Sequence, residues 1–292
     1  MLRFERFAVF AGAHGKTATI GKAAGRAHTS NAKENIMTNA EFINGYLNRI
    51  GVANVPEATP EGLKLLQVSH LKHIPFENLD IIAGRIPLKL DFEDVYDKLV
   101  VRKRGGICYE QNTLFSHLLE KMGFKVRRMA SHRVRVGANE YDHMFLMVDF
   151  SDPKETWIAD VGFGYNNLAP IRFEIGTWQS DMRDMLQVED CGNGMFYLNR
   201  RVPAGEEEVM YAFNLNDHQI EEYRPRCDYF CTASDSFFTQ GPMTSLDEAG
   251  GRKLLTRNHF HRYNANRAET VVNVPDQATY DRILKEEFGI VM

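Results

Sequence analysis

The chain has 292 residues, of which 43% are hydrophobic and 25% are charged, and its formal net charge is −4. These proportions are ordinary for a globular protein with a large core, and the negative charge argues against a nucleic-acid-binding surface. No apolar run approaches the ~18 residues of a membrane span. The four scattered cysteines do not suit a disulfide scaffold. We therefore expect a cytoplasmic protein of two domains or one elaborate one, with no nucleic-acid or membrane partner.

Residues 1–36 differ in composition from the rest of the chain. They are rich in Ala, Gly, Thr and Ser, and their six Lys and Arg residues outnumber the acidic Glu5 and Glu34. No sustained apolar period follows Phe10, so we expect a basic, poorly ordered extension. Met37 directly precedes the first clear helix signal. The folded unit is therefore predicted to begin there.

Helix-start signals dominate residues 37–125. Thr38 and Glu41 form a capping-box pattern, and Pro60 stands where a first helical residue is favoured. Asp91 precedes a third apolar period, and a fourth helix is expected to follow Cys108. The apolar stripe of this fourth helix consists of Leu114, Phe115, Leu118, Leu119 and Met122. These signals predict a helical domain over residues 37–125.

After residue 123 the apolar period changes from 3.6 to about two, which is typical of strands. A β domain is therefore predicted over residues 126–225. The strands expected in it are 126–136, 141–150, 156–161, 195–198 and 208–213. Residues 226–292 are mixed, and Pro275 and Asp276 introduce a final helix. The order of these elements indicates an α+β fold.

Cys108 is the first candidate for a functional residue. Gly105 and Gly106 allow a tight turn before it, and the helix expected after it places the thiol at the positive end of a helix dipole. A thiol in that position loses its proton more easily and becomes a nucleophile near neutral pH. The alternative is a small buried apolar residue. Cys227 and Cys231 have no second ligand pair nearby, so we interpret them as structural and expect no metal.

A nucleophilic cysteine needs a base and a residue that orients the base. His143 begins a buried apolar strand, and Asp160 ends the next one. We assume that Asp149 faces Lys154 across the intervening turn. His143 and Asp160 then become direct cross-strand neighbours. A buried aspartate requires a partner, so we predict that both residues act with the thiol. Their alternatives are a satisfied core histidine and a turn residue.

Four segments resemble the motifs of the arylamine N-acetyltransferases. They are residues 74–80 (IPFENLD), 104–112 (RGGICYEQN), 142–144 (DHM) and 160–164 (DVGFG). The chain is therefore identified as a member of this family over about residues 37–292. The extension before Met37 departs from the family pattern. A second departure is Gln111, where the family usually has Leu, and we expect this change to alter packing beneath Cys108.

The resemblance implies an enzyme with Cys108, His143 and Asp160 as its catalytic residues. It would transfer an acetyl group from acetyl-CoA to an arylamine, arylhydrazine or N-hydroxyarylamine through an acetyl-cysteine intermediate. The resemblance also implies an N-terminal helical bundle, a central β-barrel and a C-terminal α/β lid, in an arrangement like that of papain-like cysteine enzymes. Acetyl-CoA is the only cofactor expected, as the donor substrate.

The family positions also imply binding residues. Gly162, Phe163 and Gly164 are expected to contact coenzyme A, because backbone N–H groups without obstructing side chains suit phosphates or pantetheine. Phe163 and Phe76 are expected to line the acceptor pocket, where flat rings suit an aromatic substrate. The alternative for both phenylalanines is an ordinary core position.

Arg104 is expected to act as structural support. We predict that its guanidinium bonds Glu77 and also Asp80, which would tie residues 74–80 to the turn before the cysteine. Such a partly buried pair is destabilising when only one partner is removed.

Two other functions remain open. A transglutaminase- or protease-like thiol hydrolase would have the same residue order and a similar fold. A binding module would keep the fold without activity. Consumption of acetyl-CoA in the absence of any peptide separates the first from an acetyltransferase. Alkylation of Cys108 by low iodoacetamide at pH ~7 separates the second, because an inert buried thiol reacts slowly.

Overall fold

The computed structural model describes residues 37–134, 139–151, 154–164 and 168–292. The extension expected over residues 1–36 lies outside them, and Met37–Met292 form one unit. Among the described residues, no helix is both long enough and apolar enough to cross a membrane.

Local capping chemistry determines where the first helices begin. The Thr38 hydroxyl accepts a hydrogen bond from the Glu41 backbone N–H (3.3 Å), and the Glu41 carboxylate accepts one from the Thr38 N–H (2.8 Å). This completes the predicted capping box. The elements of this part are α1 (Asn39–Arg49), α2 (Pro60–His73), β1 (Phe76–Glu77), α3 (Leu79–Ile82), α4 (Phe92–Tyr96), a π-helical segment (Asp97–Val101) and α5 (Cys108–Lys121).

Helix α5 is the centre of the helical part. Helices α1 and α4 contact it, and strands β2 (Lys125–His132) and β3 (His143–Ser151) also pack against it. Four side chains of the predicted stripe are fully buried (Leu114, Phe115, Leu118 and Leu119), and the fifth, Met122, caps the helix and is partly buried. Helix α5 therefore carries its first residue on a rigid, well-packed element.

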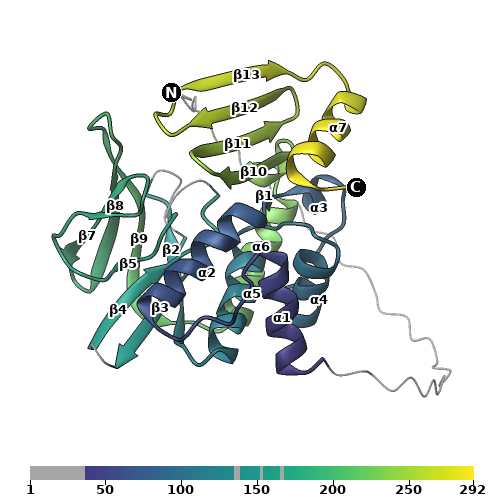
Figure 1. Cartoon of the computed structure of the whole chain (residues 1–292). Helices are drawn as coiled ribbons and strands as arrows, with labels where there is room; N and C mark the ends of the chain where they lie inside the picture. Colours follow the sequence, from purple (N-terminus) through teal and green to yellow (C-terminus); the bar gives the residue numbers. More distant parts are fainter. Residues whose placement is uncertain (1–36, 135–138, 152–153, 165–167) are drawn as a thin grey trace, which may run out of the picture. The chain divides into compact units, whose positions relative to one another are not determined.

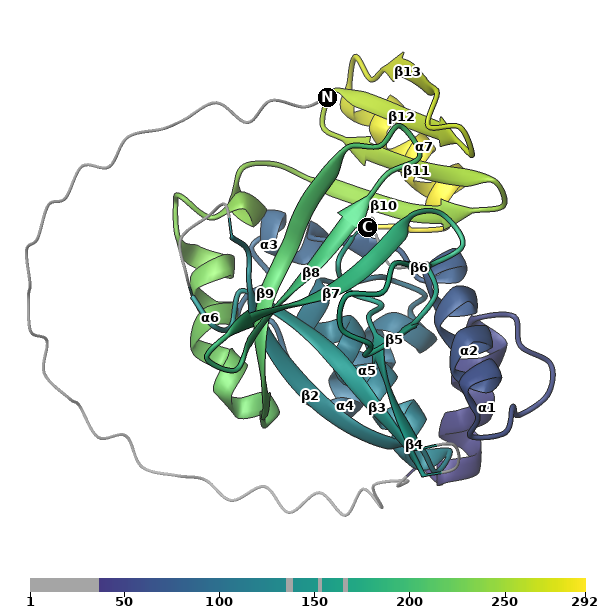
Figure 2. The same ribbon diagram turned by 90° about the vertical axis from the view of Figure 1, so that its left-hand side faces the viewer.

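The β part is an eight-stranded antiparallel sheet in the order β5-β4-β3-β2-β9-β8-β7-β6. Gln179 joins its two edge strands, because its side chain accepts from the Arg172 N–H (2.9 Å) and donates to the Arg172 carbonyl (2.8 Å). The sheet is therefore a nearly closed barrel, and Figure 2 shows its curved strands. The remaining strands are β4 (Lys154–Ala159), β5 (Ile171–Arg172), β6 (Gln179–Ser180), β7 (Met185–Gly192), β8 (Met195–Arg201) and β9 (Glu207–Asp217).

The register assumed for the β3–β4 hairpin is wrong by two residues. Ser151, and not Asp149, faces Lys154. Strand β4 ends at Ala159, so Asp160 lies just beyond the ladder. A slip of two residues keeps every side chain on its own face, whereas a slip of one would reverse it. His143 and Asp160 are therefore diagonal neighbours in place of direct ones, and they still share a face.

The C-terminal part is a five-stranded sheet with α7 packed against it (Figure 1). One of its two edge strands is β1, where Phe76 pairs with Ser245 and Glu77 with Thr244. The sheet therefore takes one strand from the segment expected to be helical. The boundary expected after residue 225 falls inside α6. The elements are α6 (Ile220–Thr232), a 3-10 turn (Phe237–Thr239), β10 (Met243–Glu248), β11 (Gly251–Thr256), β12 (His259–Asn264), β13 (Glu269–Asn273) and α7 (Gln277–Phe288).

Candidate active site

Cys108 is the first residue of α5 and is 3% exposed. Glu110 stabilises this helix start by accepting a hydrogen bond from the Ile107 N–H (3.0 Å). Gly105, three residues before Cys108, has to lack a side chain. A Cβ on Gly105 would lie 1.9 Å from the Pro75 carbonyl oxygen. The predicted helix start is confirmed, and neighbouring backbone holds the turn in place.

His143 lies between the thiol and a carboxylate. Its Nε2 bonds the Oδ2 of Asp160 at 2.8 Å, and both side chains are buried. Burial alone would lower the pKa of His143. The attraction and hydrogen bond of Asp160, together with a side-chain hydrogen bond to Cys108, outweigh burial and raise this pKa to about 9. Cys108, His143 and Asp160 are thus brought together, and the imidazole is charged at neutral pH.

Asp160 is held by more than the histidine. Its Oδ1 accepts hydrogen bonds from Asn112 Nδ2 (3.1 Å) and from the Gly162 N–H (2.8 Å). Asn112 also donates to the Met144 carbonyl (2.7 Å). Asn112, on the helix of the thiol, therefore orients a carboxylate on the facing hairpin. Sequence reasoning assigned Asn112 no role, although it lies one turn after Cys108 and is the last residue of the 104–112 motif.

Two aromatic rings pack around the imidazole of His143. Phe163 meets it edge-on with ring centroids 5.0 Å apart, and Tyr211 of β9 lies tilted at 5.4 Å. Phe76 belongs to a different cluster, together with Cys108 and Tyr109. Phe163 thus packs on the base, and Phe76 belongs to the same apolar cluster as the nucleophile. Tyr211 was missed because β9 follows far along the chain.

The two glycines of the expected coenzyme site are in different situations. A Cβ on Gly162 would lie 2.6 Å from the Cα of Cys108, and its N–H already bonds Asp160. Gly162 is therefore needed for close packing on the thiol, and its N–H is already paired with Asp160 within the protein. Gly164 has a φ of +85°, and its carbonyl accepts a hydrogen bond from Ser245 Oγ (2.7 Å).

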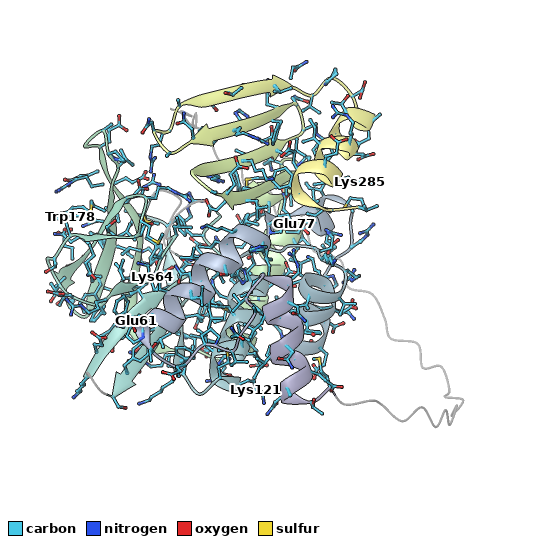
Figure 3. The ribbon with its side chains drawn as sticks, viewed as in Figure 1. Glu61, Lys64, Glu77, Lys121, Trp178 and Lys285 are labelled. Carbon is cyan, nitrogen blue, oxygen red and sulfur yellow. The ribbon has the colours of Figure 1, made fainter. Side chains whose placement is uncertain are left out.

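The predicted contacts of Arg104 are present. Its Nε donates to Glu77 (2.9 Å) and its Nη2 to Asp80 (3.2 Å). Lys98, which sequence reasoning missed, bonds Asp80 (2.9 Å) and Glu110 (2.7 Å). Figure 3 labels Glu77 where the C-terminal sheet meets the helices. The buried network thus ties β1 and α3 to the first turn of α5.

Replacing Arg104 by Gln is expected to lower the free energy of unfolding by about 3–5 kcal/mol, because Glu77 is fully buried and would lose its cation. Urea unfolding measures this change. The matched control is Arg102→Gln, since Arg102 pairs with Asp97 and both side chains are about half exposed. Arg102→Gln should lower the free energy of unfolding by less than about 1 kcal/mol. Equal effects of the two substitutions would contradict a supporting role for Arg104.

No group of three or more His, Cys, Asp or Glu side chains suited to a metal ion occurs in the part of the chain that the structure describes. Cys227 and Cys231 are both buried free thiols on α6.

A family model described as N-acetyltransferase matches residues 60–292. The "arylamine N-acetyltransferase / N-hydroxyarylamine O-acetyltransferase" of Salmonella typhimurium is 32% identical over 256 residues, which cover 85% of this chain and 89% of that protein. The arylamine N-acetyltransferase of Mycolicibacterium smegmatis is 34% identical over 211 residues, covering 68% and 74%.

Solved structures of arylamine N-acetyltransferases also match the fold of this chain. The arylamine N-acetyltransferase of Salmonella typhimurium matches with a TM-score of 0.79 and 30% identity over 85% of this chain and 91% of that one. The Mycobacterium marinum enzyme in complex with CoA matches with a TM-score of 0.78 and 30% identity over 85% and 92%. Fold and site therefore define an acyltransferase with the papain-like cysteine-enzyme fold. The chain belongs to the arylamine N-acetyltransferase family.

Proposed function

We propose that this enzyme acetylates arylamines, arylhydrazines or N-hydroxyarylamines by a two-step mechanism through an acetyl-cysteine. The observation that carries the proposal is the buried bond of 2.8 Å between His143 and Asp160, in a setting where Asp160 and the Cys108 side chain together raise the pKa of His143. A charged imidazole beside a thiol favours the thiolate, which is the nucleophilic form.

In the first step the Cys108 thiolate attacks the thioester carbonyl of acetyl-CoA. The carbon–sulfur bond to coenzyme A breaks, and the leaving thiolate takes the proton of His143. The products are acetyl-Cys108, neutral His143 and free CoA. The Cys108 N–H belongs to the first turn of α5, where N–H groups have no intrahelical partner, and it is our candidate donor to the oxyanion.

In the second step the amine nitrogen attacks the acetyl-Cys108 carbonyl. His143 accepts the amine proton as the new nitrogen–carbon bond forms, and the cysteine leaves as a thiolate. The thiolate–imidazolium pair is thereby restored. Asp160 keeps the imidazole oriented through both proton transfers, since its Oδ2 bonds Nε2 and leaves Nδ1 for the thiol side.

We further propose that Phe76 and Phe163 line the acceptor pocket. Phe163 packs on the imidazole of His143, and Phe76 shares an apolar cluster with Cys108, which supports this role. Phe163 and Gly164 are proposed to contact coenzyme A, while Gly162 permits close backbone approach to the thiol. The relative from Mycobacterium marinum was solved with CoA, which supports a CoA thioester as the donor.

The test is a panel of acyl-CoA donors combined with arylamines and arylhydrazines, with CoA release as the readout. Acetyl-CoA is expected to give CoA release that depends on the amine, and intact mass should reveal one added acetyl group when the amine is omitted. Hydrolysis of peptides with no CoA release would instead favour a thiol hydrolase. Absence of the acetyl-enzyme during full turnover would overturn the two-step mechanism.

Replacing Phe163 by Ala is expected to reduce kcat/KM for an arylamine about tenfold or more while changing that for an aliphatic amine much less. The lost ring contact is worth about 0.5–1.5 kcal/mol beyond its buried area. Steady-state rates with matched aromatic and aliphatic amines measure this ratio. The control is Phe173→Ala, because Phe173 packs against the same cluster as Phe163 but meets the ring of Phe196 edge-on. An unchanged aromatic preference in Phe163→Ala argues against the pocket.

A further inference from the structure

A chain of buried hydrogen bonds leads from α1 to the turn before the nucleophile. The Tyr46 hydroxyl lies 2.6 Å from His70 Nδ1, and His70 Nε2 lies 2.7 Å from Gln111 Oε1. The Gln111 amide nitrogen then donates to the carbonyls of Gly106 (2.9 Å) and Pro75 (3.2 Å). Tyr46, His70 and Gln111 are all buried. We call these three side chains the Tyr–His–Gln relay.

Which atom donates and which accepts in each hydrogen bond of the relay follows from the two backbone carbonyls at its end. Two carbonyls can only accept, so the amide NH2 of Gln111 faces them and its oxygen must accept from His70 Nε2–H. The His70 Nδ1 is then unprotonated and accepts from the Tyr46 hydroxyl. Burial lowers the pKa of His70 to about 3, although the bond to Gln111 opposes this shift. The relay therefore stays neutral, with one arrangement of protons, throughout the working pH range.

The relay ends on two backbone segments, one leading to Cys108 and the other to Phe76. Gly106 lies two residues before Cys108, and Pro75 directly precedes Phe76. These segments meet in a short parallel bridge, in which the Glu77 N–H donates to the Gly106 carbonyl at 3.1 Å. The second backbone bond, from the Gly106 N–H to the Pro75 carbonyl, is long at 3.4 Å. The two bonds from Gln111 reinforce this bridge on both strands.

We propose that Gln111, oriented by His70 and Tyr46, is a positioning residue that sets the place of Cys108 relative to the Phe76 segment during acetyl transfer. This inference rests on the proposed function of Cys108. It also corrects the expectation for Gln111: the side chain makes three hydrogen bonds beneath the cysteine, so it does more than alter packing.

The first test is Gln111→Leu, which installs the residue usual in the family at a similar volume. In this chain it removes the bonds to both carbonyls and leaves His70 Nε2 without its partner, so His70 and the bridge remain adapted to Gln. We expect kcat to fall tenfold to hundredfold, because a displacement of about 1 Å at a reacting atom can cost ~100-fold in rate. The KM for acetyl-CoA should change less than threefold. The control is Thr113→Val in the same buried helix, since the Thr113 hydroxyl contacts only the Met144 sulfur at 4.0 Å among the hydrogen bonds described. Its kcat should stay within twofold of wild type.

A second variant separates positioning from stability. Gln111→Leu alone strands the His70 N–H in the core, which destabilises the fold. The triple variant Tyr46→Phe/His70→Phe/Gln111→Leu removes the stranded groups, so its melting temperature should recover relative to Gln111→Leu. Its kcat at 25 °C should remain low, because no side chain donates a hydrogen bond to the two carbonyls.

Two results would overturn the proposal: normal kcat in Gln111→Leu, or a kcat restored together with the melting temperature in the triple variant. The acetyl-enzyme of the wild type is measured in parallel. If the wild type forms none, the proposed function fails. If it forms one and Gln111→Leu turns over normally, only the positioning role fails.

Discussion

Replacing Cys108 by Ser is expected to abolish the acetyl-enzyme and to lower kcat for arylamine acetylation by at least about 10⁴-fold. A hydroxyl has nearly the size of a thiol, so the buried start of α5 should keep its structure. The hydroxyl is far less acidic, and the charged imidazole of His143 cannot hold it as an anion. Intact mass after incubation with acetyl-CoA detects the intermediate, and CoA release gives the rate.

The matched control is Cys227→Ser. Cys227 is an equally buried free thiol, on α6 and outside the Cys–His–Asp group. This variant should still gain one acetyl group and turn over at close to the normal rate. Normal turnover in Cys108→Ser, or loss of the acetyl group only in Cys227→Ser, would place the nucleophile elsewhere.

Replacing Asp160 by Asn is expected to lower kcat by about 10³–10⁴-fold while leaving the fold in place. Asp160 accepts hydrogen bonds from His143, Asn112 and Gly162. An amide at this position turns its NH2 towards at least one of these donors, so the imidazole loses its orientation. The negative charge that keeps His143 protonated is lost as well.

The same substitution should change the pH dependence in a defined direction. The pKa of His143 is raised from 6.5 to about 9 in the folded protein. Its protonation therefore stabilises the fold fully below pH ~6.5, and this contribution is lost as the pH rises through about 9. Without Asp160 the pKa of His143 falls, so the alkaline limit of kcat/KM should move to lower pH. The free energy of unfolding that the protein loses between pH ~6.5 and about 9 should become smaller in this variant.

Profiles of kcat/KM and of the urea midpoint from pH ~6 to ~10 measure both effects. Asp149→Asn is the control, because Asp149 lies on the same hairpin but pairs with Arg127 and Thr156. Its profile should follow that of the wild type. If Asp160→Asn keeps the wild-type alkaline limit, the carboxylate does not set the pKa of His143.

Short-range chemistry made the local elements predictable from the sequence. The N-caps at Thr38 and Asp276 and the helix start at Cys108 each depend on residues within one helical turn. The pairing of His143 with Asp160 was also predictable, because a carboxylate beside apolar strand residues needs a partner. It survived an incorrect hairpin register only because the error was an even number of residues.

The tertiary structure alone decided which distant groups support the site. Lys98 reaches Glu110, His70 reaches Gln111 and Asn112 reaches Asp160 over separations of 12, 41 and 48 residues. Neither helical nor strand periodicity specifies such pairs. Once packing removes a polar side chain from water, it must bond whatever group lies nearest in space. The sequence by itself determined that the thiol, the imidazole and the carboxylate need partners, and the folded chain determined which side chains hold them in place.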